Sequence, residues 1–347
     1  MHMADALINP AVGGTMWIVS TGLIAWCAHK LKQTMNDRLV PMMGVLGAFI
    51  FAAMMINFSI PVTGSSGHLG GGLILTILLG PYAAFIVIAS VLTVQAFFFA
   101  DGGLLALGCN IFNLGFFPAF IAYPLVYRVI ARDEHGTLRA WIAAIVAAVV
   151  GLQLGAFGVV LETKASGISE LPFGTFVLLM QPIHLAIGIV EGLATAAVVT
   201  FVARARPEAL FSARLDMQPR NSMQPVLIGL LIATVIVGGA ASWFASTHPD
   251  GLEWSIAKVS GQEEVTGTED NLHKGLGQLQ EKTAFLPDYG FKSTATETAP
   301  AEKTAAEPEQ WPAISAGTSV SGIVGGLITL GLAGLIGFAL KARRAGV

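Results

Sequence analysis

The first two residues of the chain, Met1 and His2, place three nitrogen atoms where a single metal ion can reach them all. The donors are the α-amine of Met1, the peptide nitrogen of His2 and the His2 imidazole. His68, in the glycine-rich stretch Gly64 to Gly72, supplies a fourth nitrogen if the fold brings that stretch against the terminus. Four nitrogens in one plane suit a divalent nickel or copper ion, and cobalt is also compatible.

The Met1-His2 pair is a weak signal on its own, because a histidine at position 2 also arises by chance. His2 is too bulky to permit the usual removal of the initiator methionine, so we expect Met1 to be retained. The segment also lacks the basic start of a secretory signal, and Asp5 precedes the first apolar stretch. We therefore expect the amine to be available.

The composition indicates an integral membrane protein. Hydrophobic residues make up 54% of the 347 residues and charged residues only 12%, which is too apolar for a soluble domain of this length. Cys27 and Cys109 both lie within apolar segments and form neither a disulfide framework nor a zinc signature. We interpret both as packing residues.

Apolar runs near the roughly 20 residues that cross a bilayer predict an all-α, polytopic helix bundle with about nine transmembrane segments. The third run is short for a full crossing and Pro81 follows it, so we expect a short or tilted helix inside the bundle. The expected segments are 13–29, 40–58, 69–80, 82–100, 104–127, 138–160, 174–203, 224–245 and 318–340.

Basic residues predict the orientation, because cytoplasmic loops carry an excess of Lys and Arg. All four basic clusters fall on one side only if the third segment crosses. The N-terminus and the His68 loop then lie outside the inner (plasma) membrane, and the C-terminus lies inside. The clusters are Lys30, Lys32 and Arg38; Arg128, Arg132 and Arg139; Arg204, Arg206, Arg214 and Arg220; and Lys341, Arg343 and Arg344.

A polar segment from about Ser246 to Ser315 separates the last two apolar runs, and it holds 12 acidic residues against 5 lysines. Its first part, Pro249 to Ile256, predicts a short amphipathic helix after an Asp-Gly turn. Its later part, Thr294 to Pro312, is typical of a disordered acidic linker. The acidic charge is either a solvated surface or a means of concentrating divalent cations at the entrance. We expect two units, a core of about seven helices (1–220) and an accessory region (221–347).

Several motifs together resemble the CbiM/NikM family, the substrate-binding membrane components of energy-coupling factor (ECF) transporters for cobalt and nickel. The resemblance covers about residues 1 to 205, and the string Pro249 to Glu253 resembles the PDGLE-type C-terminal accessory region. The motifs are the Met-His start, Gly64 to Gly72 around His68, Asp101 to Leu104 with Gly108 to Asn113, and His184 to Gly192.

The resemblance implies that the metal is held by the Met1 amine, the His2 amide and imidazole, and His68. It also implies two ATP-binding subunits and a transmembrane coupling (T) subunit as partners. This chain departs from the family in one place, since Asp5 is followed by Ala6 where members commonly have glycine.

Other polar residues lie within the apolar segments. His184 and Glu191 are spaced to share one helical face, which predicts either a structural polar contact or a role in metal passage or coupling. We expect Asn57, Asn110 and Asn113 to brace the His68 loop or to join helices, and Ser66 to lie near the metal ligands.

The chain lacks a Gly-x-x-x-x-Gly-Lys-Ser/Thr phosphate loop, so we expect ATP hydrolysis to occur in separate subunits. The predicted function is the metal-binding subunit of a nickel or cobalt importer, and the sequence does not separate the two ions. A membrane metal sensor or chaperone is the alternative. A metalloenzyme is disfavoured because a closed plane of four nitrogens leaves no position for substrate.

Overall fold

The computed structural model describes residues 2–132, 134, 136–169, 171–211, 223–262, 270–292 and 311–345. Six helices in this part of the chain are long and apolar enough to cross a membrane, and two shorter apolar helices, α2 (Leu39–Met54) and α10 (Gln224–Gly239), join them. The fold is therefore a multi-pass helical membrane bundle, as predicted. The six are α1 (Pro10–Thr34), α4 (Pro81–Phe99), the run Leu107–Ala131, α7 (Leu138–Ser166), α8 (Phe173–Ala205) and α13 (Ala316–Ala345).

The run Leu107–Ala131 is built from three pieces: α5 (Leu107–Ile111), the π-helical η2 (Phe112–Tyr127) and α6 (Arg128–Ala131). Pro118 and Pro124 lie inside η2 and lack the N–H groups that an ordinary helix uses. The wider π-helical turn fits a helix whose regular hydrogen-bond ladder is interrupted in this way.

Small residues allow two pairs of helices to approach closely. A methyl group at Gly188 of α8 would lie 2.9 Å from the Cα atom of Val149 in α7. In the same way, a methyl group at Gly238 of α10 would lie 3.1 Å from the Cα atom of Gly322 in α13. Each glycine therefore permits backbone contact between neighbouring helices.

An antiparallel hairpin, which was not predicted, precedes the third predicted segment (69–80). Strands β1 (Phe58–Ile60) and β2 (Ser65–Gly67) pair in the register Phe58 with Gly67, and the eight-residue helix α3 (Gly72–Leu79) follows. All eight residues of α3 are buried, so the expectation of a short helix inside the bundle is confirmed.

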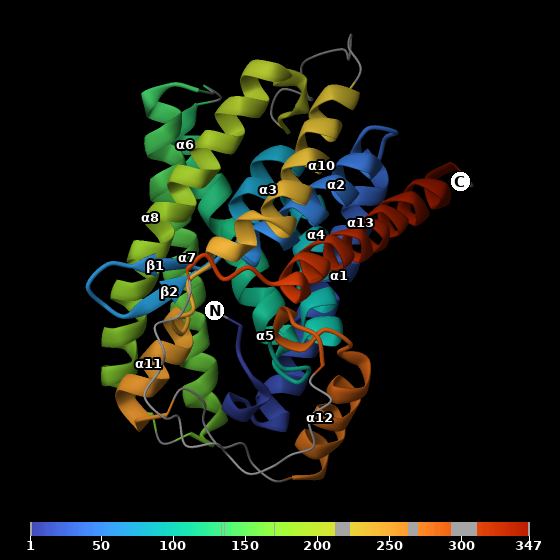
Figure 1. Cartoon of the computed structure of the whole chain (residues 1–347). Coiled ribbons are helices and arrows are strands. Elements are labelled where there is room, and N and C mark those ends of the chain that lie inside the picture. The colour runs from blue at the N-terminus through green and yellow to red at the C-terminus, as the bar shows by residue number, and fades with distance from the viewer. Residues whose placement is uncertain are drawn as a thin grey trace.

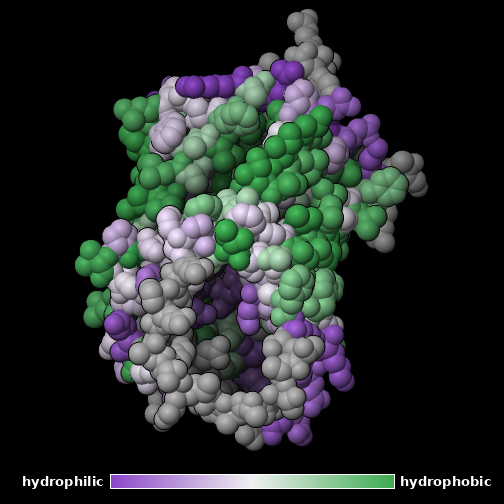
Figure 2. Space-filling model, viewed as in Figure 1, coloured by the Kyte–Doolittle hydropathy of each residue, from purple (hydrophilic) through white to green (hydrophobic). Residues whose placement is uncertain are grey.

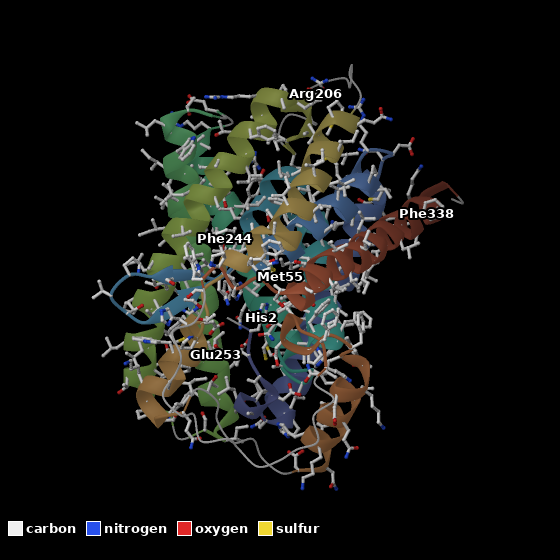
Figure 3. The ribbon with its side chains drawn as sticks, viewed as in Figure 1. His2, Met55, Arg206, Phe244, Glu253 and Phe338 are labelled. Atoms are coloured by element: carbon white, nitrogen blue, oxygen red, sulfur yellow. The ribbon has the colours of Figure 1, made fainter. Side chains whose placement is uncertain are left out.

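The C-terminal end of α3 lies far along the bundle from the hairpin. Phe211 beyond α8 donates its backbone N–H to Ile77 O at 3.1 Å, and its ring packs on Gly80. Pro81 and Tyr82 line a pocket together with Thr34, at the end of α1. The chain from His68 to Gly80 thus leads toward the end of the molecule where Figure 3 labels Arg206.

The polar segment between α10 and α13 folds at the opposite end of the molecule from α6 (Figure 1). It contains α11 (Gly251–Ser260), which confirms the predicted amphipathic helix, and α12 (Asn271–Thr283), which was not predicted. Most of the predicted linker Thr294 to Pro312 falls outside the described residues. The remaining short helices are η1 (Asp5–Leu7), η3 (Pro207–Ala209), η4 (Ala241–Phe244) and η5 (Pro287–Tyr289).

Candidate metal centre

His68 follows directly after strand β2 and is buried, with 8% of its surface exposed. The accessory region holds the hairpin in place, because the Ser66 backbone N–H donates to Pro249 O at 2.8 Å and the Ser66 hydroxyl to His248 O at 2.7 Å. His68 Nδ1 lies 3.1 Å from Leu69 O. A carbonyl only accepts, so this contact places the proton on Nδ1 and the lone pair of the neutral ring on Nε2.

Glu191 of α8 fixes the backbone that follows His68. Its Oε2 atom accepts the Gly70 N–H at 2.7 Å, and its Oε1 atom accepts the Gly71 N–H at 3.2 Å. Gly71 has a φ of 72°, which a residue with a side chain rarely adopts, and a methyl group there would lie 2.6 Å from Ile50. The loop geometry around His68 therefore depends on a carboxylate from a distant helix.

His184 lies on the same face of α8 as Glu191, as predicted, and it faces the same loop. Its Nδ1 atom donates to Met180 O at 2.8 Å, and within the described residues its buried Nε2 atom has no hydrogen-bond partner. His184 and His68 line a common cavity of about 10 Å³, room for about one water molecule. Glu191 therefore forms hydrogen bonds to the loop, whereas His184 forms its hydrogen bond within its own helix, and a role of the pair in metal passage or coupling stays a prediction.

The N-terminal segment runs into the same place (Figure 3). The ring of His2 stacks on that of His68, with centroids 4.9 Å apart and planes 5° from parallel. Met3 is fixed by Asn110, whose Oδ1 atom accepts the Met3 N–H at 2.8 Å and whose Nδ2 atom donates to Met3 O at 3.2 Å. The structure thus brings His2 and His68 together, while Met1 lies outside the described residues.

The other predicted polar residues have different roles from one another. Asn110 braces the N-terminal segment rather than the His68 loop, and Asn113 donates from Nδ2 to Glu162 Oε2 at 2.7 Å, which joins η2 to α7. The Asn57 carbonyl accepts the Ser246 N–H at 2.7 Å. Neither Asn57 nor Asn113 forms a hydrogen bond to the backbone of the His68 loop among the contacts of the described residues.

Asp101 is a residue of the centre that the sequence reading quoted in a motif but did not assign. Its Oδ1 atom lies 2.9 Å from His2 Nδ1, and its Oδ2 atom accepts the hydroxyl hydrogen of Tyr289 from the accessory region. Burial by itself raises the pKa of the Asp101 carboxyl, but the charge of His2 and the hydrogen bonds from His2 and Tyr289 lower it well below its usual range. Asp101 is therefore a carboxylate at neutral pH.

Asp5 and His273 anchor the segment that follows His2. Asp5 Oδ1 accepts the Ala106 N–H at 3.0 Å, and His273 Nε2 of α12 lies 2.9 Å from Ile8 O. The alanine at position 6, where the family commonly has glycine, belongs to the short helix η1. Neither contact was predicted, because Asp5 and His273 belong to no pattern in the sequence that indicates their partners.

The chemistry of the site follows from which nitrogens are available. Burial lowers the pKa of His68 to about 3, so its imidazole is neutral and competent to bind metal near pH 7. No group of three or more His, Cys, Asp or Glu side chains is arranged to hold a metal ion in the part of the chain that the structure describes. A metal site at His2 and His68 must therefore draw on backbone nitrogens as well.

A backbone chelate at His2 requires a particular ring atom. Only Nδ1 is close enough to the His2 amide nitrogen to close a small chelate ring, and Nδ1 is the atom that contacts Asp101. A metal ion bound through the amide and Nδ1 would therefore replace the hydrogen bond to Asp101.

Comparison with known proteins agrees with this architecture. A family model described as the cobalt uptake substrate-specific transmembrane region (CbiM) matches residues 2–209, and a PDGLE domain model matches residues 224–342. A crystal structure of a transition metal transporter is 27% identical, with a TM-score of 0.54, over 62% of this chain and all of the other.

Relatives share both parts or only the first. A putative fused nickel transport protein NikMN from Archaeoglobus fulgidus is 32% identical over 343 residues, 98% of each chain. The fused nickel transport protein NikMN of Rhodobacter capsulatus is 30% identical over 83% of this chain and 88% of the relative. The cobalt transport protein CbiM of Sorangium cellulosum is 28% identical over 60% of this chain and 94% of the relative. The chain therefore belongs to the CbiM family of cobalt and nickel transport membrane proteins, with a PDGLE domain fused behind the CbiM region.

Proposed function

We propose that this chain is the metal-binding membrane subunit of an ECF-type importer for nickel or cobalt ions. The ion is held by the Met1 amine, the His2 amide and Nδ1 nitrogens, and the His68 imidazole. The observation that carries this proposal is the stacking of His2 on His68 at 4.9 Å, although the two residues lie 66 positions apart in the sequence. Nickel and cobalt transport are also the activities for which the relatives are named.

Import against a gradient requires energy that this chain does not itself supply. The sequence contains no phosphate-binding loop, so two ATP-binding subunits and a transmembrane coupling subunit complete the importer. We assign residues 1–220 to the metal-binding core and residues 221–347 to the accessory region.

The proposed orientation has nine crossings, with the N-terminus outside the inner membrane and the C-terminus inside. Two contacts support it. Phe211 meets Ile77 near the end of α3, and Lys341 forms an ion pair with Asp37 in the loop after α1. Both contacts place an end of an expected crossing close to a basic cluster. Under the positive-inside rule, the basic clusters mark the cytoplasmic side.

Absorbance titration of the purified full chain with nickel tests the ligand set. A planar nickel–nitrogen complex absorbs in the visible range and is yellow, and we expect this band with the native terminus. One residue added before Met1, His2→Ala or His68→Ala should each remove it, whereas His29→Ala, at an exposed histidine of α1, should leave it unchanged. Full binding by the extended chain would refute the role of the amine.

Metal uptake distinguishes an importer from a sensor or chaperone. Cells that express the chain together with its ATP-binding and coupling subunits should accumulate nickel or cobalt above the level of cells without the chain. Accumulation that does not depend on the chain, with metal binding intact, would favour the sensor or chaperone and overturn the importer.

A further inference from the structure

A cavity of about 440 Å³ is lined by residues of both the candidate metal centre and the accessory region, and we call it the entrance cavity. Figure 2 shows a hollow with hydrophilic residues inside it, on the face where Figure 3 labels His2 and Glu253. The core contributes His2, His68 and Asp101 to its wall, and the accessory region contributes Asp250 and Glu253 among others.

Acidic side chains outnumber basic ones in the wall of the entrance cavity. Five carboxylates and three histidines line it, and its described lining residues include no lysine and no arginine. An excess of carboxylates favours the entry of positive ions. The carboxylates belong to Asp5, Asp101, Asp250, Glu253 and Asp288.

Backbone hydrogen bonds hold the two carboxylates of α11 in place. Asp250 Oδ1 accepts the N–H groups of Leu252 at 2.7 Å and Glu253 at 2.9 Å, and Glu253 Oε2 accepts the Asp250 N–H at 2.9 Å. This reciprocal capping box fixes both side chains at the first turn of the helix. The wall is therefore a built surface with carboxylates at set positions.

A second observation at the same cavity points to a ligand. The side chain of His2 is 7% exposed, and within the described residues its Nε2 atom is buried without a hydrogen-bond partner. His2 Nδ1 contacts Asp101, so Nε2 is the ring nitrogen that remains for a ligand in the cavity. A buried polar atom beside a polar cavity needs a hydrogen-bond partner such as a water molecule.

The size of the entrance cavity fits a metal ion that still carries its water shell. Six waters occupy about 180 Å³ at roughly 30 Å³ each, so a hexahydrated ion is smaller than the cavity of about 440 Å³. Carboxylates can hold such an ion through its bound waters, as they do for hydrated magnesium. The water shell also supplies the hydrogen-bond partner that His2 Nε2 lacks within the described residues.

We propose that the entrance cavity is a separate binding site for a hydrated divalent cation, occupied before the ion exchanges its waters for nitrogens. Carboxylates from both the core and the accessory region hold the ion through its waters, and His2 Nε2 forms a hydrogen bond with one of these waters. The inference rests on the proposed function, because the next step takes the ion to His2 and His68.

Hexaamminecobalt(III) tests this site directly, because it resembles a hydrated cation in size and does not exchange its ligands on the time scale of binding. The inert ion cannot enter the nitrogen chelate. We expect it to bind the full chain at low ionic strength and to slow the appearance of the nickel band several-fold, with the final amplitude at saturating nickel unchanged.

Two matched variants locate the binding. Glu253→Gln removes one charge from the cavity and keeps the capping box, since glutamine also accepts the Asp250 N–H. Glu281→Gln removes one charge from the exposed face of α12. Glu253→Gln should weaken hexaamminecobalt(III) binding about fivefold to tenfold, and Glu281→Gln by less than twofold.

Equal effects of the two variants, or an absence of hexaamminecobalt(III) binding, would overturn the entrance site. Neither outcome bears on the chelate, which is tested by the nickel band of the His2 and His68 variants. Failure of the chelate would instead appear as an intact nickel band in His68→Ala, whatever hexaamminecobalt(III) does.

Discussion

The two walls of the entrance cavity differ in their balance of donor atoms. The core wall presents two imidazoles, His2 and His68, beside two carboxylates, whereas the accessory wall presents three carboxylates and one imidazole, that of His273. Imidazole and amide nitrogens discriminate among divalent transition metals, while carboxylates attract hard and hydrated cations with little discrimination. Under the proposed function, the nitrogens of the core select the metal, and the carboxylates, most of them in the accessory wall, capture it.

The walls also differ in how they are held. The His68 loop is fixed by Glu191 and by glycines that pack without space for a methyl group. The accessory wall is held by helix caps and by single contacts such as Tyr289 with Asp101. Changes in the core should therefore have larger effects than changes in the accessory region.

Two glycines with the same backbone conformation give the largest expected contrast. Gly71 and Gly64 both have a φ of 72°, but a methyl group at Gly71 would meet Ile50 at 2.6 Å and one at Gly64 would meet nothing within 4 Å. Gly71→Ala should lower the free energy of unfolding by about 2 to 5 kcal/mol, and Gly64→Ala by about 1 to 2 kcal/mol. Thermal unfolding in detergent measures both, and equal losses would contradict close packing at the loop.

Acid should destabilise the core through His68. Its pKa is about 3 in the folded protein and about 6.5 in an unfolded chain, so between these values only the unfolded chain takes up the proton. Stability therefore falls as the pH falls below about 6.5, by about 2 kcal/mol at pH 5. With a chelator present, His68→Leu should lose this part of the pH dependence and the exposed His29→Leu should keep it. Identical pH profiles for all three proteins would show that His68 is not buried as a neutral ring.

Removal of the charge at Glu191 should weaken metal binding without removing a ligand. Glu191→Gln retains one carbonyl oxygen for the Gly70 or Gly71 N–H but lacks the second acceptor. Groups that orient a metal ligand typically contribute 10- to 100-fold in affinity, so we expect about tenfold weaker nickel binding in the absorbance titration. As a control, Glu134→Gln, at an exposed residue between α6 and α7, should leave the nickel affinity unchanged. An unchanged nickel affinity in Glu191→Gln would show that metal binding does not depend on the hydrogen bonds that Glu191 forms to the His68 loop.

Loss of the Tyr289 hydroxyl should have the smallest effect of the series. Tyr289→Phe removes one hydrogen bond to Asp101, while Asp101 keeps its contact to His2. One such bond to a charged group contributes about 1.5 to 3 kcal/mol locally, and because the loss falls on Asp101 rather than on a ligand we expect a change in nickel affinity of only a few-fold. A loss as large as that of Glu191→Gln would mean that the accessory region takes part in selection as well as in capture.

Much of the architecture could be predicted from the sequence. Long apolar runs have no stable place outside a membrane, so the segments and their helical form followed from composition and length alone. Eight of the nine expected segments are helices of 16 residues or more, and the count of nine crossings stays a prediction. The shared face of His184 and Glu191 also followed, because helical periodicity is local.

The contacts around the metal centre were decided by tertiary structure. Met1, His2 and His68 were identified from the chemistry of their side chains and the terminus, and the basic clusters predicted that they face the same side. The hydrogen bonds from Asp101 to His2 and Tyr289 could not be predicted, since they join residues 99 and 188 positions apart and follow no local pattern. The sequence by itself determined the membrane class, the helices and the candidate ligands. Only the packing of distant segments decided which carboxylates surround them, because that arrangement depends on long-range contacts rather than on local periodicity.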